Sequence, residues 1–356
     1  MPTGSVRGTA RARSTLTSPS FPCSLTKERV MQRRHLLRSG LLLTGAAAAG
    51  SLARASGFAG SERDAPEFTG LDGWMNRNAP TSVAGSRGKV LLVNFWTYSC
   101  INCRRTIPYL KRFQSEYGPL GLQVIGIHTP EFGFEHDRAN VDTYVRQTGI
   151  SYPVGQDNNF RTWDAWNNEA WPGFYIVNRD GRIVQVCVGE DHAHEMEGII
   201  RGLLGLSQTV PYGLTGDDPE LSRIGSPEMY FGSIHPTPQD SRQSPRLGET
   251  DYSFVPTPRL NEYQLNGVWS RNGEPLVLRS SLGALRLRFS AAKLHLVAST
   301  PETATVRIRV DGSEAQSVKI SWPTLYTLVD GETYGEHFLE LETDTPGLAL
   351  FSATFG

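Results

Sequence analysis

Two cysteines separated by two residues follow directly on an apolar run of strand length. The run is KVLLVNFW, residues 89 to 96, and the cysteines are Cys100 and Cys103. Because a helical pattern follows, Cys100 is expected at a helix N-terminus, where free backbone N–H groups and the helix dipole stabilise a thiolate. Cys103, one turn further on, is placed to attack a mixed disulfide formed at Cys100. This junction predicts a thiol–disulfide exchange site on an α/β fold.

The segments around this junction alternate between strand and helix patterns. Apolar residues at helical spacing favour helices, and short apolar runs rich in β-branched residues favour buried strands. The expected elements are a strand at 89–96, a helix at 104–117 that contains Pro108, a strand at 122–127, a helix at 138–148, an extended segment at 152–154, a hairpin of strands 172–177 and 182–188, and a helix at 195–206. This order predicts a three-layer α/β domain over residues 56–206.

The second half of the chain differs from the first in composition and in the spacing of its apolar residues. Residues 207–250 are rich in Pro, Gly and Ser without periodicity, which indicates a linker or a long connection. Beyond them, apolar residues alternate with Arg or Glu, as in LRLRF (285–289) and VRIRV (306–310). Turn signals recur at intervals of roughly ten residues, so we expect an all-β sandwich of jelly-roll-like form over residues 251–356.

Residues 1–55 are predicted to be an extension and an export signal rather than part of the fold. Arg33 and Arg34 precede a weakly apolar run, and Ala53-Arg54-Ala55 closes it with the spacing of a cleavage site. The paired arginines indicate a twin-arginine signal, hence a periplasmic or extracytoplasmic protein. Four consecutive alanines with flanking glycines disfavour the alternative of an amphipathic first helix. The run is too short to span a bilayer, so the mature chain is not expected to cross a membrane, whether translation starts at Met1 or Met31.

The number and spacing of the cysteines favour a redox-active pair over structural disulfides. The chain has four cysteines, and Cys23 precedes the export signal and should be lost with it. An exported domain that relied on disulfides for stability would keep more than one close pair and a single cysteine. We therefore expect the pair to be redox-active and Cys187 to be a small buried residue.

Metal, cofactor and nucleic-acid functions are disfavoured by the residues present. A structural zinc site would need two further ligands at matched spacing, and His192 and His194 lie far along the chain from the cysteine pair. The net charge is −1 and no basic run is present, so no nucleic-acid partner is expected. We expect neither a metal nor a cofactor.

Several motifs resemble the thioredoxin superfamily. NFWTYSCINCRRTIPYL, GIHTPEF and AWPGFYIVNRDGRIV are similar to exported TlpA/ResA-like thiol–disulfide oxidoreductases, and most of all to the extracytoplasmic part of DipZ-type proteins. The likeness covers about residues 70–206. SPEMYFG (226–232) and LYTLVDG (325–331) resemble the β-sandwich that follows the thioredoxin domain in DipZ-type proteins. The resemblance implies a thioredoxin fold and disulfide-bonded exported proteins as substrates. Because the DipZ-type membrane domain has no counterpart here, it also implies a CcdA- or DipZ-type membrane electron donor.

The resemblance assigns roles to individual residues. Cys100 would be the attacking nucleophile, Cys103 the resolving thiol, and Pro172 a cis-proline that faces the pair, although a proline at the start of an edge strand is also common. The buried Asp of thioredoxin is replaced by Asn94, which cannot take a proton. Glu131, in HTPEF, stands where TlpA/ResA-like proteins have an active-site Glu, so we predict that it carries the proton; the alternative is a solvated loop carboxylate.

Aromatic residues gather around the expected site at positions 96, 98, 163, 166 and 171. Most should pack in the core or at its rim. Trp96 and Trp171 flank the two active segments and are predicted either to form a substrate-facing surface or to pack internally.

The C-terminal half offers a possible binding module. Trp269, Trp322 and Tyr334 could stack on sugar rings, or they could fill a core or dock onto the redox domain. We favour packing or docking.

A peroxidase is the second enzymatic interpretation. Thr97 and Cys100 form the T-x-x-C of peroxiredoxins, but the proline of that family, four residues before the threonine, is Val93 here. A second cysteine at CxxC spacing fits exchange better, although an exposed reactive thiol can also react with peroxide.

The direction of electron flow is the least determined feature. Strongly oxidising relatives often carry a His between the cysteines, whereas this chain has Ile101 and Asn102. That difference favours a reductase or isomerase over a disulfide-forming oxidant.

Overall fold

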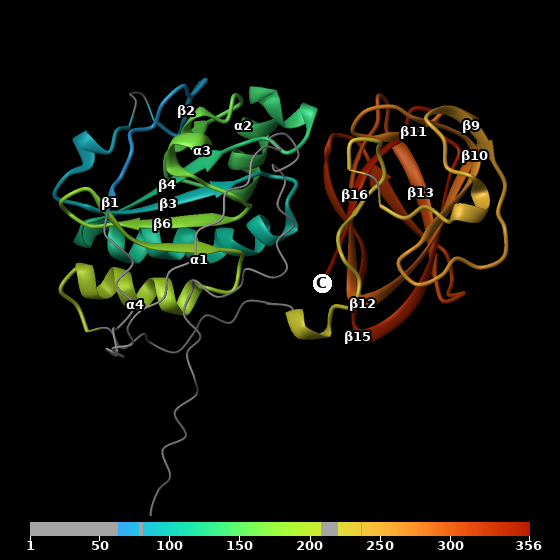
Figure 1. Cartoon of the computed structure of the whole chain (residues 1–356). Helices are drawn as coiled ribbons and strands as arrows, with labels where there is room; N and C mark the ends of the chain where they lie inside the picture. Colours follow the sequence, from blue (N-terminus) through green and yellow to red (C-terminus); the bar gives the residue numbers. More distant parts are fainter. Residues whose placement is uncertain (1–62, 78–80, 208–219, 236) are drawn as a thin grey trace, which may run out of the picture.

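The computed structural model describes residues 63–77, 81–207, 220–235 and 237–356, which form an α/β domain and an all-β domain (Figure 1). The expectations for the export signal, for Cys23 and for the start of translation lie outside these residues. In the ranges described, no helix is long and apolar enough to cross a membrane.

The α/β domain is built on a seven-stranded sheet with the order β1-β7-β6-β3-β4-β5-β2. Its strands are β1 (Arg63–Asp64), β2 (Gly73–Met75), β3 (Val90–Trp96), β4 (Leu122–His128), β5 (Val154–Gln156), β6 (Gly173–Val177) and β7 (Arg182–Val188). Strand β3 pairs parallel to β4 and antiparallel to β6. The central strands and the terminal hairpin therefore have the arrangement that the sequence predicted.

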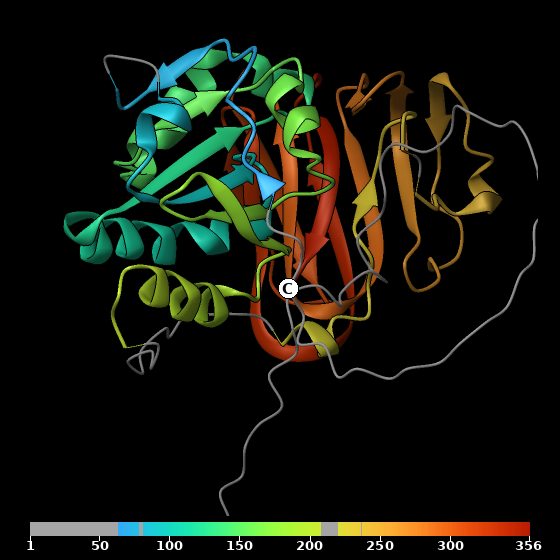
Figure 2. The same cartoon turned by 60° about the vertical axis from the view of Figure 1, so that its left-hand side comes forward.

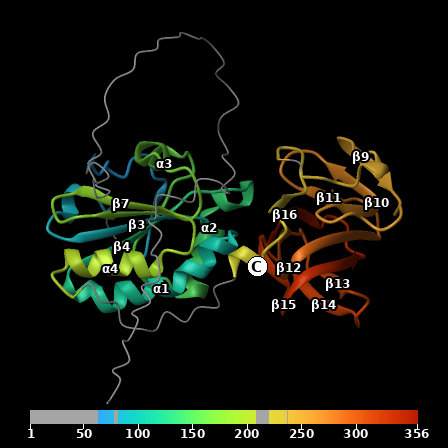
Figure 3. The ribbon, with the colours of Figure 1, turned by 60° about the horizontal axis from the view of Figure 1, so that its bottom comes forward.

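Helices cover both faces of this sheet. They are α1 (Ile101–Tyr117), α2 (Arg138–Thr148), α3 (Arg161–Trp166) and α4 (Ala193–Leu203). Side chains of α1, α2 and α4 share one hydrophobic core, and α3 packs in the core on the opposite face. Figures 1 and 3 show α1 and α4 side by side along the sheet.

Strand β3 explains why the sheet is covered on both sides. All seven of its residues are buried. Alternate side chains of a strand point to opposite faces, so Val90 and Leu92 enter one core while Leu91 and Val93 enter the other. A central parallel strand has this continuous apolar sequence because neither face meets water.

The C-terminal domain is all-β, as expected. Its strands are β8 (Met229–Tyr230), β9 (Gly248–Tyr252), β10 (Tyr263–Arg271), β11 (Leu276–Leu278), β12 (Gly283–Ser299), β13 (Ala304–Val310), β14 (Gln316–Ile320), β15 (Thr324–Thr343) and β16 (Ala349–Phe355). They form one nine-stranded sheet in which β12 also pairs with β16. That extra pairing closes β10, β11, β16 and β12 into a barrel-like ring.

The predicted alternation in the C-terminal domain is confirmed in β12. Leu285, Leu287 and Phe289 are buried in the domain core. The intervening Arg286 and Arg288 point outward and pair with glutamates of β15 at 3.0 and 2.7 Å. Such exposed pairs contribute little stability, so burial of the apolar face defines the register.

Part of the stretch predicted as a connection belongs to the C-terminal sheet. Strand β8 lies within residues 207–250, and its Tyr230 is paired with Ser352 of β16. A strand of two residues is too short to produce the alternation on which the sequence prediction depends.

The two domains are in contact, and in Figure 2 the C-terminal domain lies partly behind the α/β domain. One hydrophobic cluster contains side chains from both and is called here the interdomain cluster. Its buried members are Ile101 and Phe132 of the α/β domain and Tyr230, Val297, Leu325, Ala349 and Phe351 of the C-terminal domain. Because Ile101 directly follows Cys100, the C-terminal domain packs beside the CxxC motif.

Candidate active site

The cysteine pair lies at the N-terminus of α1, as predicted. The helix begins at Ile101 rather than Arg104, so that Cys100 is its N-cap residue and its Sγ accepts a hydrogen bond from the backbone N–H of Cys103 at 3.4 Å. Both cysteines are free thiols, and Cys100 is half-buried whereas Cys103 is fully buried. The Cys100 sulfur therefore lies beside the free N–H groups at the start of the helix. The pair thus combines a reachable nucleophile with a hidden second thiol.

The second thiol is held in its protonated form. Burial is the main cause that raises the pKa of Cys103 well above its usual value, and the adjacent Cys100 and the negative charge of Glu131 raise it further. A backbone hydrogen bond at Thr97 opposes these effects. Since only a thiolate attacks a disulfide efficiently, Cys103 needs a nearby group that accepts its proton.

Glu131 lies within electrostatic reach of Cys103. It follows β4 in the HTPEF loop, is half-buried, and contributes to the raised pKa of the Cys103 thiol. Its Oε1 accepts a hydrogen bond from the Tyr230 hydroxyl at 2.9 Å. The arrangement is compatible with the predicted role as proton carrier.

Glu135 is a structural anchor that the sequence interpretation missed. Its carboxylate is fully buried. One oxygen accepts from the backbone N–H and hydroxyl of Ser99 at 3.1 and 2.7 Å, and the other from the N–H groups of Glu131 and Phe132 at 2.6 and 3.0 Å. The carboxylate therefore joins the loop before Cys100 to the loop that carries Glu131. A second acidic residue four positions after Glu131 was the only signal in the sequence.

Arg104 was also missed, and it links the CxxC loop to the C-terminal domain. Its Nε donates to the Tyr98 carbonyl at 2.7 Å, and its other nitrogens donate to the Leu325 carbonyl at 3.0 Å and to Thr324 Oγ1 at 2.6 Å. Burial lowers the pKa of Arg104, and attraction to Tyr144 and then to Cys100 opposes that effect. A half-buried cation thus lies near the nucleophile.

Pro172 lies at the edge of the sheet from which the CxxC loop departs. The Trp171–Pro172 peptide bond is cis, in agreement with the prediction. The following residue, Gly173, is paired with Phe95 near the end of β3. Asn94 is buried, and its Nδ2 donates to the carbonyls of Phe95 and Gly173 at 3.3 and 3.4 Å. Asn94 therefore stabilises the strand pair next to the site.

The prediction of a substrate-facing surface is wrong for Trp96. Its side chain is 1% exposed and packs edge-to-face on His128, with ring centroids 5.2 Å apart. Strand alternation directs it into the core beneath α1 and α2. Burial also lowers the pKa of His128 to about 3, so that this imidazole is neutral at neutral pH. Trp171 is half-buried against Trp163, with ring centroids 4.5 Å apart, and its contact with substrate stays a prediction.

All three aromatic residues considered for sugar stacking make contacts within the protein. Trp269 is fully buried in its own domain. Trp322 stacks on Tyr98 with ring centroids 5.8 Å apart and an interplanar angle of 13°, and the Tyr98 hydroxyl donates to the Pro323 carbonyl at 3.1 Å. Trp322 therefore docks onto the redox domain, which is the interpretation the sequence favoured. The Tyr334 hydroxyl accepts from the Glu220 N–H at 2.9 Å.

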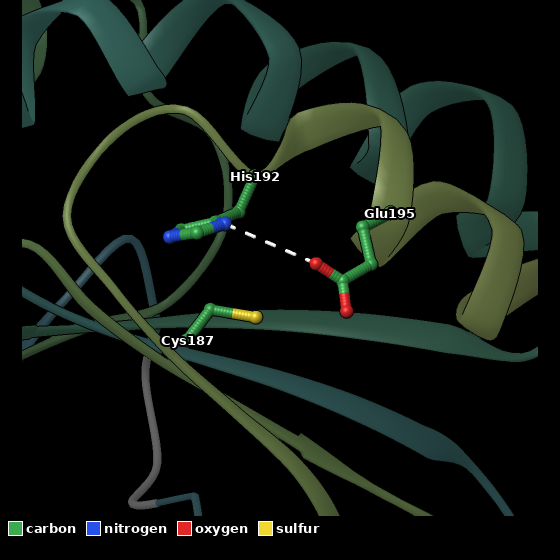
Figure 4. Close-up of side chains that lie close together, drawn as sticks. All are labelled: Cys187, His192 and Glu195. Carbon is green, nitrogen blue, oxygen red and sulfur yellow. Dashed lines mark ion pairs between the residues drawn. The ribbon is translucent and has the colours of Figure 1, made fainter. Parts of the chain in front are cut away.

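A second side-chain cluster lies between β7 and α4. Cys187, His192 and Glu195 have their ligand atoms within 4.8 Å of one another (Figure 4). The fold thus brings together residues that the sequence interpretation treated separately. His192 Nε2 is 3.0 Å from the Val188 carbonyl, and its Nδ1 is 3.9 Å from Glu195 Oε2. Cys187 is fully buried, as predicted, but it is disulfide-bonded rather than a free thiol, so its sulfur is not available as a thiolate ligand.

Two protein-family models match the chain. Residues 59–203 match the redoxin family, and residues 226–356 match the thioredoxin-like C-terminal domain family. The two matches fall on the two domains of the structure.

The chain is also similar to curated proteins and to solved structures. Protein DipZ of Mycobacterium tuberculosis is 32% identical over 299 residues, which are 82% of this chain and 43% of DipZ. The thiol-disulfide oxidoreductase ResA of Bacillus subtilis is 25% identical over 178 residues, 48% of this chain and 95% of ResA. A thiol-disulfide isomerase from Corynebacterium glutamicum aligns with a TM-score of 0.36 and 22% identity over 40% of this chain and 98% of its own. The chain spans less than half the length of DipZ.

Proposed function

We propose that this thioredoxin-like protein, with its redoxin domain followed by a thioredoxin-like C-terminal domain, reduces disulfides in exported proteins by dithiol exchange. The observation that carries the proposal is the unequal cysteine pair. Cys100 is half-buried at the N-terminus of α1, and Cys103 is fully buried one turn further on. This asymmetry suits a reaction in which one thiol meets the substrate and the other releases it.

The proposed reaction has two steps. The Cys100 thiolate attacks one sulfur of a substrate disulfide, forms a mixed disulfide and releases the first substrate thiolate. Cys103 then attacks Cys100 Sγ, which forms the Cys100–Cys103 disulfide and releases the second substrate thiolate. The substrate gains two electrons and the protein loses two, while the Cys103 proton passes to Glu131. The thiolate is the attacking species, and the positive charge of Arg104 and the N-terminus of α1 lie beside it.

The source of electrons and the place of action are parts of the same proposal. The twin-arginine pattern at Arg33 and Arg34 supports export. A reductant outside the cytoplasm must be reduced again after each turnover, so we infer a CcdA- or DipZ-type membrane electron donor. Disulfide-bonded exported proteins are the substrate class, and no nucleic acid takes part.

The direction of exchange is tested by the reduction potential of the Cys100–Cys103 pair. The purified protein is equilibrated with thiol buffers of graded potential, and its free thiols are counted. We expect a value near that of thioredoxin, roughly −270 mV. A value near roughly −120 mV would make the protein an oxidant that forms disulfides. The absence of a reversible two-electron couple would overturn the exchange mechanism.

Replacing Glu131 with glutamine should move the ionisation of Cys103 to lower pH. The negative charge of Glu131 is one cause of the raised pKa of this thiol, and a neutral amide removes it. The measurement is thiolate ultraviolet absorbance against pH in reduced protein that carries Cys100→Ser. Glu116→Gln is the control because that carboxylate is exposed on the far end of α1. An unchanged Cys103 titration in Glu131→Gln contradicts the assigned role.

A further inference from the structure

The SPEMYFG segment brings a tyrosine of the C-terminal domain to the redox site. The Tyr230 hydroxyl donates to Glu131 Oε1 at 2.9 Å, across 99 positions of sequence. Tyr230 is 7% exposed and belongs to the interdomain cluster. This hydrogen bond joins the C-terminal domain to the carboxylate assigned to proton transfer.

Contacts other than the hydrogen bond to Glu131 also hold Tyr230 in place. Its backbone is paired with Ser352 of β16. Thr237 closes a local loop, because its Oγ1 accepts from the Tyr230 N–H at 3.0 Å and donates to the Tyr230 carbonyl at 2.8 Å. The ring also contacts Phe132, with centroids 6.4 Å apart. The hydroxyl therefore has a fixed position relative to the C-terminal sheet.

The loop that carries Glu131 is seated on the same surface. The Gly133 N–H donates to Glu274 Oε2 at 2.7 Å. Phe132 and Phe134 both pack on Phe351, with ring centroids 5.2 and 4.9 Å apart. The position of the Glu131 backbone is thus determined by the C-terminal domain as well as by Glu135.

We propose that Tyr230 is a positioning residue for Glu131, so that docking of the C-terminal domain completes the proton-transfer group of the redox site. The inference rests on the proposed dithiol exchange. A phenol that donates to a carboxylate orients it and favours its ionised form. Ionised Glu131 is the form that can accept the Cys103 proton when Cys103 attacks the mixed disulfide.

Other titratable or charged groups surround Glu131. Cys103 faces it from α1, and the Glu135 carboxylate binds its backbone N–H. From the C-terminal domain, the His235 ring lies with its centroid 5.9 Å from that of Tyr230, and the Glu274 carboxylate accepts a hydrogen bond from the neighbouring Gly133 N–H. A test must therefore separate the Tyr230 hydroxyl from these groups.

The test follows the reaction of the reduced full-length protein with the dithiobis(nitrobenzoate) disulfide at a series of pH values. The first nitrothiolate released reports attack by Cys100, and the second reports attack by Cys103. Tyr230→Phe should slow the second release by roughly 3- to 10-fold near neutral pH. It should also move the acidic inflection of that step upward by about half a pH unit or more. The first release should not change.

A double-mutant cycle distinguishes positioning from packing. Glu131→Gln should remove the acidic inflection, and adding Tyr230→Phe to Glu131→Gln should change the second release less than about twofold. Tyr252→Phe is the matched control, because it removes a hydroxyl from a buried tyrosine of the same domain that binds Arg246 and not Glu131. An equal effect of Tyr230→Phe in both backgrounds would overturn the proposal, as would no effect in either.

A second variant covers the case in which Tyr230→Phe fails to fold. Tyr230→3-fluorotyrosine keeps the ring and strengthens the hydroxyl as a donor, so the inflection of the second release should move downward. An upward or unchanged inflection contradicts the proposal. If the unsubstituted protein did not release nitrothiolate in two successive steps, the dithiol exchange itself would be contradicted. That result differs from the absence of a Tyr230 effect.

Discussion

Replacing Cys100 with serine is expected to lower the rate of disulfide reduction by at least about 1,000-fold, because the attacking nucleophile is lost. The measurement is reduction of a small disulfide by the reduced protein at neutral pH. No other free thiol of the described residues is reachable, since Cys103 is fully buried. The same variant should form no mixed disulfide with a protein substrate.

Cys103→Ser is the matched variant with a different expected result. Cys100 should still attack, but the mixed disulfide should accumulate because no second thiol resolves it. Non-reducing electrophoresis and mass measurement of the trapped species distinguish the two variants. If Cys100→Ser kept the activity and formed the trapped species, the assigned roles would be reversed. If Cys103→Ser turned over peroxide at the unsubstituted rate, the peroxidase alternative would gain support.

Replacing Glu135 with alanine should have the largest effect on stability. We expect the free energy of unfolding to fall by about 3–5 kcal/mol, because this truncation leaves four donors without their acceptor in a fully buried site. Denaturant unfolding of the whole chain measures it, with the redox domain followed separately by near-ultraviolet circular dichroism.

Glu116→Ala is the control for that measurement. Glu116 is an exposed glutamate of α1 that pairs with Arg112 four residues earlier, and its loss should cost no more than about 0.5 kcal/mol. A Glu135→Ala variant as stable as this control would show that the carboxylate does not hold the two loops together.

The sequence predicted most of the α/β domain because its central elements are long and strongly patterned. Strand β3 has six apolar or aromatic residues and a single polar residue, Asn94, and α1 repeats Ile107, Leu110 and Phe113 on one face. The strands β1 and β2 and the helix α3 were not predicted. They contain two, three and six residues, which is too few for a recognisable period.

The sequence predicted only those site residues that lie next to a recognisable strand or helix. Cys100, Cys103 and Pro172 stand at element boundaries that the sequence marks. Arg104 and Tyr230 make their contacts at the site with partners 221 and 99 positions away, so no local pattern could have indicated them.

The prediction that Trp96 faces a substrate was wrong because local sequence does not show what packs on a residue. An aromatic residue near a motif gives no information about which face of its strand is covered, and here α1 and α2 cover it.

Because Ile101 packs between the two domains, the dipeptide between the cysteines cannot be exchanged for another without affecting the domain contact. This side chain is 8% exposed within the interdomain cluster. A designer who transplanted another dipeptide into this motif would alter the fit of the two domains together with the chemistry of the thiols. A change in the dipeptide would therefore have to be matched by a change in the surface that packs on it.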